Sequence, residues 1–132
     1  MGYRSEIAIK IYGSESVMEL VQEKYREIFN EASTETKADI SVVMEDDGNT
    51  INGWITGGTT NPKCFSVYQD SIKWYEDFGF VHFFTELMDY AEEAGANVEF
   101  IRIGEDAGDI EIHRFGDNLE YLIDYETRIV GA

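Results

Sequence analysis

The chain is poor in cysteine, in basic residues and in long apolar runs, and these absences exclude several classes of protein. Its only cysteine, Cys64, cannot form an internal disulfide, which argues against a disulfide-stabilised secreted scaffold and for a reducing compartment. No stretch approaches the roughly 20 apolar residues that a transmembrane helix needs. The opening MGYRSE lacks the basic and then apolar pattern of a signal peptide. We therefore expect a cytoplasmic protein that does not contact a membrane.

The scarcity of basic residues gives the chain a strong negative charge. Ten Lys and Arg stand against 27 Asp and Glu, and the formal net charge is -17 in 132 residues. Such a surface repels nucleic acids and anionic membranes, and it attracts basic proteins, cations and polyamines. Since 43% of the residues are hydrophobic and 14% aromatic, the charge belongs to a folded globule and not to a disordered acidic tail. Solubility alone also explains an acidic surface, and the sequence leaves both explanations open.

Common catalytic and ligand-binding motifs are absent from the sequence. It contains no phosphate-binding loop, no dinucleotide-binding glycine pattern, no G-x-S-x-G turn and no Cys or His pair at zinc spacing. The two histidines, His82 and His113, and Cys64 belong to no motif, so we interpret them as surface or packing residues. We accordingly predict no catalytic residue, no cofactor and no metal ligand, and a non-enzymatic protein is favoured.

The spacing of apolar residues predicts the helices and strands. A capping-box spacing from Ser16 to Glu19 opens a helix that ends near residue 31. The apolar positions from 78 to 94 predict a second helix, which Gly95 caps. Residues 32–39 read as a polar connection. The expected strands lie at 3–12, 40–45, 51–55, 64–75 (interrupted) and 97–104. A further strand begins at 110, and the last one lies at 119–129.

The order strand, helix, strand, strand, helix, strand matches a ferredoxin-like split unit, and two more antiparallel strands follow it. We predict one α+β domain over residues 1–132, with two helices on one face of a mainly antiparallel sheet and a C-terminal hairpin extension. The other face of the sheet is expected to stay partly open.

Acidic residues concentrate in two turns and in one stretch before the second predicted helix. The turns at 45–49 and 105–109 suit Ca²⁺, Mg²⁺ or a basic protein, or they are simply solvated, and neither follows the EF-hand pattern. Residues 74–77 join two aromatic to two acidic side chains. That is the composition of an interface hot spot, and also of a core cap beside a helix N-terminus.

Carboxylates also repeat along the last predicted strand and, together with Glu111, form an acidic sheet edge. Charge of this kind protects an edge from unwanted pairing, or it imitates the phosphates of a nucleic acid. The candidate partner-binding residues are Glu45, Asp46, Asp47, Trp74, Tyr75, Glu76, Asp77, Glu105, Asp106, Asp109, Glu111, Glu120, Asp124 and Glu126.

Three stretches of the chain have a recognisable composition: MGYRSE at the start, IKWYED at 72–77, and FIRIGED at 100–106 followed by DIE at 109–111. In this order they resemble a group of small acidic proteins encoded by bacteriophages and prophages. That group has no established activity, so the resemblance implies no catalytic residues. It implies a phage origin and expression inside a bacterial cell. The segment 32–62 lies outside the resemblance.

Three hypotheses about function follow from these observations. The first is a non-enzymatic protein that binds a basic surface of a host protein, as a nucleic-acid mimic that inhibits a host defence or nucleic-acid enzyme. The second is a small-ligand or divalent-metal-binding protein, or an enzyme, that uses the acidic loops around Asp47 and Asp106. The third is a virion structural or assembly protein in which an edge strand pairs in a homo-oligomer.

Overall fold

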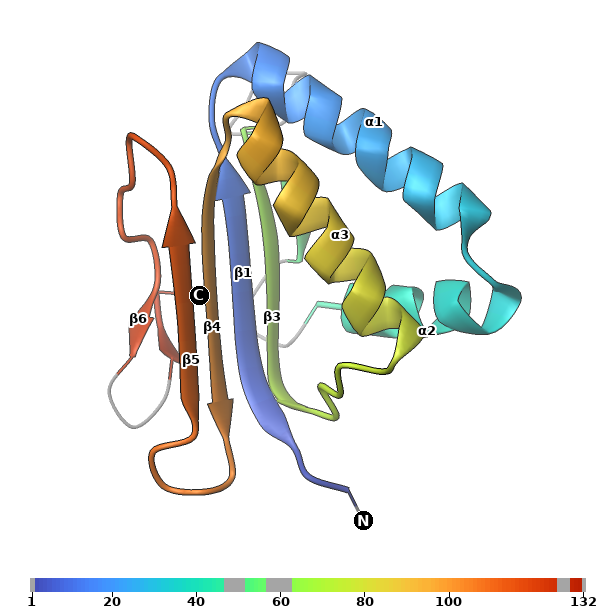
Figure 1. Cartoon of the computed structure of the whole chain (residues 1–132), viewed down its shortest axis with the longest axis vertical. Coiled ribbons are helices and arrows are strands. Elements are labelled where there is room, and N and C mark those ends of the chain that lie inside the picture. Colours follow the sequence, from blue (N-terminus) through green and yellow to red (C-terminus); the bar gives the residue numbers. More distant parts are fainter. Residues whose placement is uncertain (1, 47–51, 57–62, 126–128, 132) are drawn as a thin grey trace.

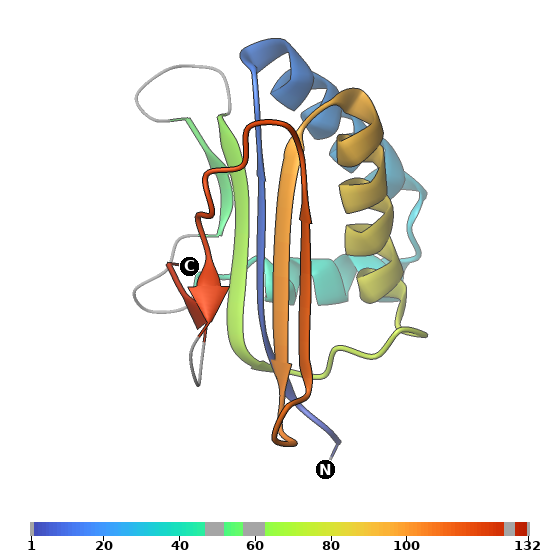
Figure 2. The ribbon, with the colours of Figure 1, turned by 60° about the vertical axis from the view of Figure 1, so that its left-hand side comes forward.

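The computed structural model describes residues 2–46, 52–56, 63–125 and 129–131 of the chain. Within these residues, three helices lie against one face of a five-stranded sheet, and a two-stranded hairpin that is not part of the sheet lies on its other face (Figures 1 and 2). The elements are, in chain order, β1 (Ser5–Tyr12), α1 (Glu15–Glu31), α2 (Thr34–Val43), β2 (Gly53–Ile55), β3 (Cys64–Ile72), α3 (Gly79–Ala94), β4 (Asn97–Gly104), β5 (Ile110–Phe115), β6 (Asp124–Tyr125) and β7 (Ile129–Val130).

The sheet has the strand order β2-β3-β1-β4-β5, and every neighbouring pair of strands is antiparallel. Its first four strands in the chain therefore have the arrangement of a ferredoxin-like split unit, and β5 extends the sheet beyond β4. Strands β6 and β7 form the separate antiparallel hairpin. The predicted α+β class and mainly antiparallel sheet are confirmed.

The main core lies between the sheet and the helices. Helix α1 begins at the N-cap Ser14, whose hydroxyl accepts a hydrogen bond from the Val17 N–H (3.4 Å), so it starts earlier than the predicted cap at Ser16. Helix α3 ends at Gly95, which has the left-handed φ of 96° that glycine adopts without strain. Fully buried residues of this core include Ile7, Ile9 and Ile11 of β1, Met18 and Val21 of α1, and Phe84 and Leu87 of α3.

The opposite face of the sheet is more closed than we predicted. Ile123 and Ile129 from the C-terminal segment pack against Ala8 and Ile101 in a second apolar cluster. Figure 2 shows that segment on the side of the sheet away from the helices. Strand β1 is therefore buried on both faces along most of its length, and not half-buried as its alternation suggested.

A buried carboxylate, Glu99 of β4, holds the C-terminal segment on this face. The Tyr12 hydroxyl donates a hydrogen bond to it, and the Leu122 backbone N–H donates another at 3.0 Å. Arg114 Nε lies 3.4 Å from its other oxygen. Burial, and then the contact with Glu99, raises the pKa of Tyr12 to about 12, so this hydroxyl stays a donor at any ordinary pH.

A second carboxylate on the same face, Glu6 of β1, makes a similar attachment. It accepts hydrogen bonds from the Tyr68 hydroxyl (2.6 Å) and from the Ile129 backbone N–H (3.2 Å). In the part of the chain that the structure describes, no buried side-chain nitrogen or oxygen lacks a hydrogen-bond partner. Glu6 and Glu99 are thus structural, and both are already hydrogen-bonded within the protein.

The predicted connection at 32–39 and strand at 40–45 are wrong, because helix α2 occupies 34–43. Ser33 caps the helix by accepting a hydrogen bond from the Thr36 N–H (3.1 Å). Its buried residues, Ile40 and Val43, are three apart and face the core, whereas Val42 is 61% exposed. A short run of apolar residues fits the helical and the strand period equally well, which is why alternation misled the prediction.

The predicted strand over 119–129 is also largely wrong. Residues 119–123 form no regular element, and among the described residues after them the strands are the two-residue β6 and β7. Tyr121 has a φ of 51°, outside the extended region, and the N–H of Leu122 points to Glu99 instead of to a neighbouring strand. Ile123 and Ile129 are buried against the sheet, whereas Tyr121 is 64% exposed and Tyr125 is 37% exposed, so the alternation does not correspond to one packed face.

Candidate functional site

A groove of about 920 Å³ lies between helix α3 and the strands β4 and β5. It exists because β5 extends the sheet beyond the area that α3 covers (Figure 1). We call it the α3–β5 groove. Its lining residues are Tyr3, Trp74, Tyr75, Glu76, Asp77, Val81, His82, Thr85, Met88, Asp89, Glu92, Phe100, Arg102, Asp109, Glu111 and His113.

Strand register and helix periodicity bring these side chains together. Phe100 pairs with His113, and Arg102 pairs with Glu111, across the β4–β5 ladder. Directly opposed residues of an antiparallel pair share one face of the sheet, so all four face the groove. On α3, the polar residues recur at positions 82, 85, 89 and 92, a spacing that places them along one side of the helix.

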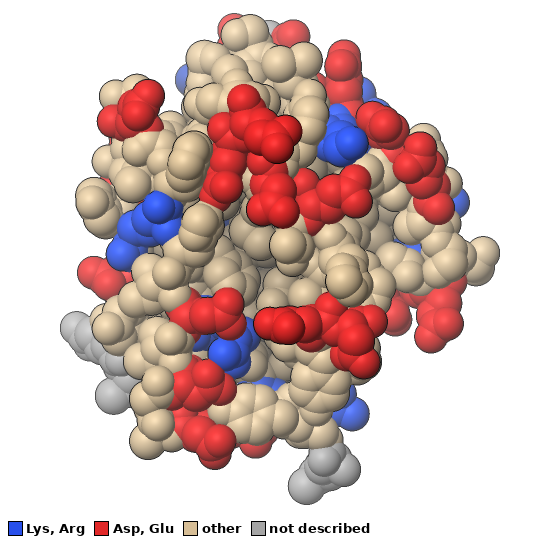
Figure 3. Space-filling view, viewed as in Figure 1, with Lys and Arg blue, Asp and Glu red and all other residues tan. Residues whose placement is uncertain are grey.

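The groove is strongly acidic. Six carboxylates line it against one guanidinium, so the lining carries a formal charge of -5 with both histidines neutral. Figure 3 shows this face of the molecule, where acidic side chains gather in separate groups around a hollow of uncharged atoms. In a cleft lined mainly by negative charges, the low-dielectric protein walls focus the electrostatic potential, which favours a cationic ligand.

One end of the groove is fixed by Arg102. Its Nη2 lies 2.7 Å from Asp109 Oδ1, and its Nε lies 2.8 Å from Glu111 Oε1. The Tyr3 hydroxyl donates to Asp109 Oδ2 at 2.6 Å. The contacts with Arg102, and then with Tyr3, lower the pKa of Asp109 to about 2. Both carboxylates are therefore engaged by Arg102 within the protein, and its single charge compensates one of their two.

The Asp109 contacts predict an acid-dependent contribution to stability. Because its pKa falls from 3.8 to about 2 on folding, the stabilisation is fully present above pH 3.8 and is lost as the pH falls through about 2. Asp109→Asn should remove this part of the acid sensitivity, as measured by urea unfolding between neutral pH and about pH 2. Asp106→Asn, at an exposed position of the same turn, is the control. Equal acid sensitivity of wild type and Asp109→Asn would contradict the assignment.

Three of the other four carboxylates that line the groove are available to a ligand. Glu76, Asp77 and Asp89 are exposed, and none of them makes a hydrogen bond or ion pair with another described residue. Glu92 contacts the Nε2 atom of His113 across the groove and so links α3 to β5. Three uncompensated carboxylates thus stand around the opening.

An aromatic cluster supports the end of the groove near Trp74. The Trp74 ring lies 5.8 Å from the Phe80 ring, 6.2 Å from Phe84 and 5.9 Å from Phe100, measured between centroids. Tyr75 packs on Phe78 at 4.9 Å. Aromatic side chains held in this way give a rigid surface for cation–π contact with Lys or Arg.

Only some of the predicted partner-binding residues meet at this site. Trp74, Tyr75, Glu76, Asp77, Asp109 and Glu111 line the groove. Glu105 and Asp106 lie beside it, in the β4–β5 turn, where Glu105 accepts a hydrogen bond from the Arg4 N–H (3.1 Å) and the Asp106 N–H donates to the Tyr3 hydroxyl (2.8 Å).

The remaining predicted residues lie elsewhere. Glu45 and Asp46 follow α2, where Asp46 accepts a hydrogen bond from the Asn52 N–H (3.0 Å). Glu120 and Asp124 belong to the C-terminal segment, and Glu120 is not in a strand, so the predicted acidic sheet edge does not form as described. Asp47 and Glu126 lie outside the described residues.

Sequence reasoning missed the contribution of α3 to the groove. Asp89 and Glu92 are lining residues, and His82, treated as isolated, lies on the same side of the helix. The signal was present in the recurrence of polar residues at 82, 85, 89 and 92 within an otherwise apolar helix. A polar stripe beside an apolar one marks where a helix stops contacting the core.

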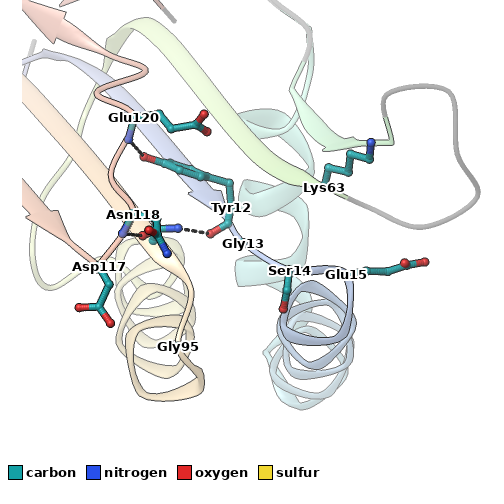
Figure 4. A pocket seen from close by; sticks show the side chains of 10 residues that line it. Tyr12, Gly13, Ser14, Glu15, Lys63, Gly95, Asp117, Asn118 and Glu120 are labelled. Atoms are coloured by element: carbon teal, nitrogen blue, oxygen red, sulfur yellow. Dashed lines mark hydrogen bonds between the residues drawn. The ribbon is translucent and has the colours of Figure 1, made fainter.

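A second hollow, of about 840 Å³, lies where β1 leads into α1 (Figure 4). The Asn97 side chain donates to the Tyr12 carbonyl (3.3 Å) and accepts from the Asn118 N–H (3.1 Å). The Glu120 N–H donates to the Tyr12 hydroxyl (2.7 Å). Figure 4 shows these hydrogen bonds along one wall of the hollow, where they connect residues 118–120 to the sheet. We interpret this hollow as structural.

Comparison with known proteins places the chain in no family: no family model, no curated protein and no solved structure matches it significantly. None of the helices in the described ranges is long and apolar enough to cross a bilayer. The same ranges contain no group of three or more His, Cys, Asp and Glu side chains that could hold a metal ion.

Proposed function

We propose that this protein is a non-enzymatic binding protein whose α3–β5 groove engages a basic surface of a host protein. One observation supports this most strongly: Glu76, Asp77 and Asp89 surround the opening without a cationic partner among the described residues. Exposed charges at the rim of an interface stay hydrated, so their desolvation cost on binding is small. They also steer an oppositely charged partner toward the site. Trp74 and Tyr75 supply the aromatic contact surface that interface hot spots favour.

The class of partner follows from charge and from resemblance. The likeness of three sequence stretches to small acidic phage proteins supports a bacterial host as the source of the partner. Separate groups of carboxylates around a groove resemble the phosphates of a nucleic acid in the sign of their charge. We therefore propose, as the first class to test, a nucleic-acid enzyme of the host, including enzymes of host defence, whose basic surface normally contacts phosphates.

Capture from a bacterial lysate at two salt concentrations tests this function. The immobilised protein is expected to retain a basic, nucleic-acid-binding protein at about 0.1 M salt and to release it at about 1 M, where the Debye length falls from about 10 to about 3 Å. Retention that does not depend on salt would contradict an electrostatic interface. Recovery of no basic protein at either concentration would contradict the function itself.

A further inference from the structure

Strand β5 is an unprotected edge of the sheet. It pairs with β4 on one side, and no described residue pairs with its other side. Figure 2 shows the outer side of β5 uncovered along its length, with the β6–β7 hairpin displaced to the face away from the helices. Its register with β4 contains no bulge, and residues 110–115 contain no proline. An edge of this kind presents unpaired N–H and C=O groups to a further strand.

Polar and apolar residues of β5 alternate between its two faces at positions 110–113. Arg114 shares the face of Ile110 and Ile112 but is turned toward the C-terminal segment, where its Nη2 donates to the Ile123 carbonyl (2.6 Å). Glu111 and His113 point into the α3–β5 groove. Ile110 and Ile112 alternate with them on the other face and are 36% and 42% exposed. A strand added at this edge would therefore have one row of side chains beside acidic residues and the other row beside exposed isoleucines.

We propose that this edge accepts an extended segment of the basic partner as an additional antiparallel or parallel strand, an inference that rests on the function proposed above. The segment carries Lys or Arg on the groove side and apolar residues on the other side, in strict alternation. Neighbouring strands lie about 4.8 Å apart, so a basic side chain beside Glu111 comes within contact of the carboxylate. If the bound segment shifted its pairing with β5 by one residue, its basic side chains would move to the isoleucine face and its apolar side chains to the acidic groove. The affinity therefore depends on the alternation of basic and apolar residues, and not on basic content alone.

Charge favours a basic partner over a second copy of this chain on the same edge. Each copy carries a formal charge of -17. Two-fold pairing of β5 with itself would also bring two α3–β5 grooves, each with an acidic lining, to the same face of one continuous sheet. Like charges in that arrangement repel, whereas a basic segment neutralises the groove.

Peptide binding tests the inference. An eight-residue peptide of alternating Lys and Ile is compared with a shuffled peptide of the same composition and with the alternating peptide N-methylated at every second residue. We expect the alternating peptide to bind about tenfold more tightly than either, because main-chain pairing and side-chain register contribute together. Ile112→Lys should reduce that affinity about tenfold, since it adds a cation to the face that meets apolar residues. Ile55→Lys, a partly exposed position on the opposite edge strand β2, is the matched control and should not change it.

The outcomes separate this inference from the function on which it rests. Equal, salt-sensitive binding of all three peptides would overturn strand addition and leave the acidic binding function standing. Binding of none of them, together with lysate capture of a basic protein, would also overturn strand addition alone. A dimer of the unliganded protein that Ile112→Lys dissociates, observed by sedimentation, would assign the edge to a second copy and overturn the proposal.

Discussion

Replacing Glu99 with alanine is expected to lower the free energy of unfolding by about 3 kcal/mol. The substitution leaves the Tyr12 hydroxyl and the Leu122 N–H without their acceptor, and it leaves Arg114 without its closer carboxylate. A buried donor that loses its acceptor still carries the full cost of desolvation. The expected loss of stability is therefore larger than the net contribution of an ordinary hydrogen bond. Urea unfolding followed by tryptophan fluorescence measures the change.

Two further variants test whether the loss of stability comes from the missing hydrogen-bond acceptor at Glu99. Glu99→Gln keeps an oxygen acceptor and should lose less stability than Glu99→Ala, while Glu93→Ala removes an exposed carboxylate of α3 and should change stability little. Amide hydrogen exchange at residues 122–123 should accelerate in Glu99→Ala beyond the change at β1, because the C-terminal segment detaches first. A loss below about 1 kcal/mol would show that Glu99 does not hold this segment.

Neutralising the free carboxylates of the groove is expected to weaken partner binding about 30-fold at low salt. The triple variant Glu76→Gln, Asp77→Asn and Asp89→Asn removes three exposed charges, each worth up to about 1 kcal/mol in a pair, or about 2 kcal/mol together. The effect should lie mainly in the association rate, because charges at an interface rim act by steering. Surface plasmon resonance with the partner captured from lysate measures both rates.

A matched control distinguishes the groove from the overall charge. Glu19→Gln, Glu23→Gln and Glu31→Gln remove the same number of exposed carboxylates from α1. This variant has the same net charge as the groove variant and should retain most of the wild-type affinity. If both variants lose affinity equally, the interaction depends on net charge alone and the groove is not the site.

Local sequence patterns predicted those parts of the fold that local physics determines. The alternation of Ile7, Ile9 and Ile11 identified β1, and Gly95 marked the end of α3. The C-terminal segment escaped prediction because its position depends on Glu99, which bonds Leu122 across 23 positions of sequence. A lone glutamate within the apolar run at 98–103 was the available sign that a buried partner existed.

The candidate site was predicted in parts but not as a whole. The IKWYED and DIE stretches contain six of its residues, yet they are separated in sequence and meet only through the position of α3 and the register of β4 with β5. Counting carboxylates also overestimated the negative charge that the turn at 105–109 offers to a partner. Arg102 and Tyr3 engage Asp109, so the lining carboxylates of the groove that lack a partner are Glu76, Asp77 and Asp89.

The most direct test of the account uses the two tryptophans as internal reporters. Trp74 lines the α3–β5 groove, whereas Trp54 lies in β2 at the opposite edge of the sheet, against Tyr25 and Phe65. In a heteronuclear NMR titration of the ¹⁵N-labelled protein with a hexa-arginine peptide, we expect the Trp74 indole signal and the amides of α3 and β5 to shift, while Trp54 and α1 stay unchanged. Equal shifts at Trp54 or along α1 would mean that cations bind the acidic surface without preference for the groove.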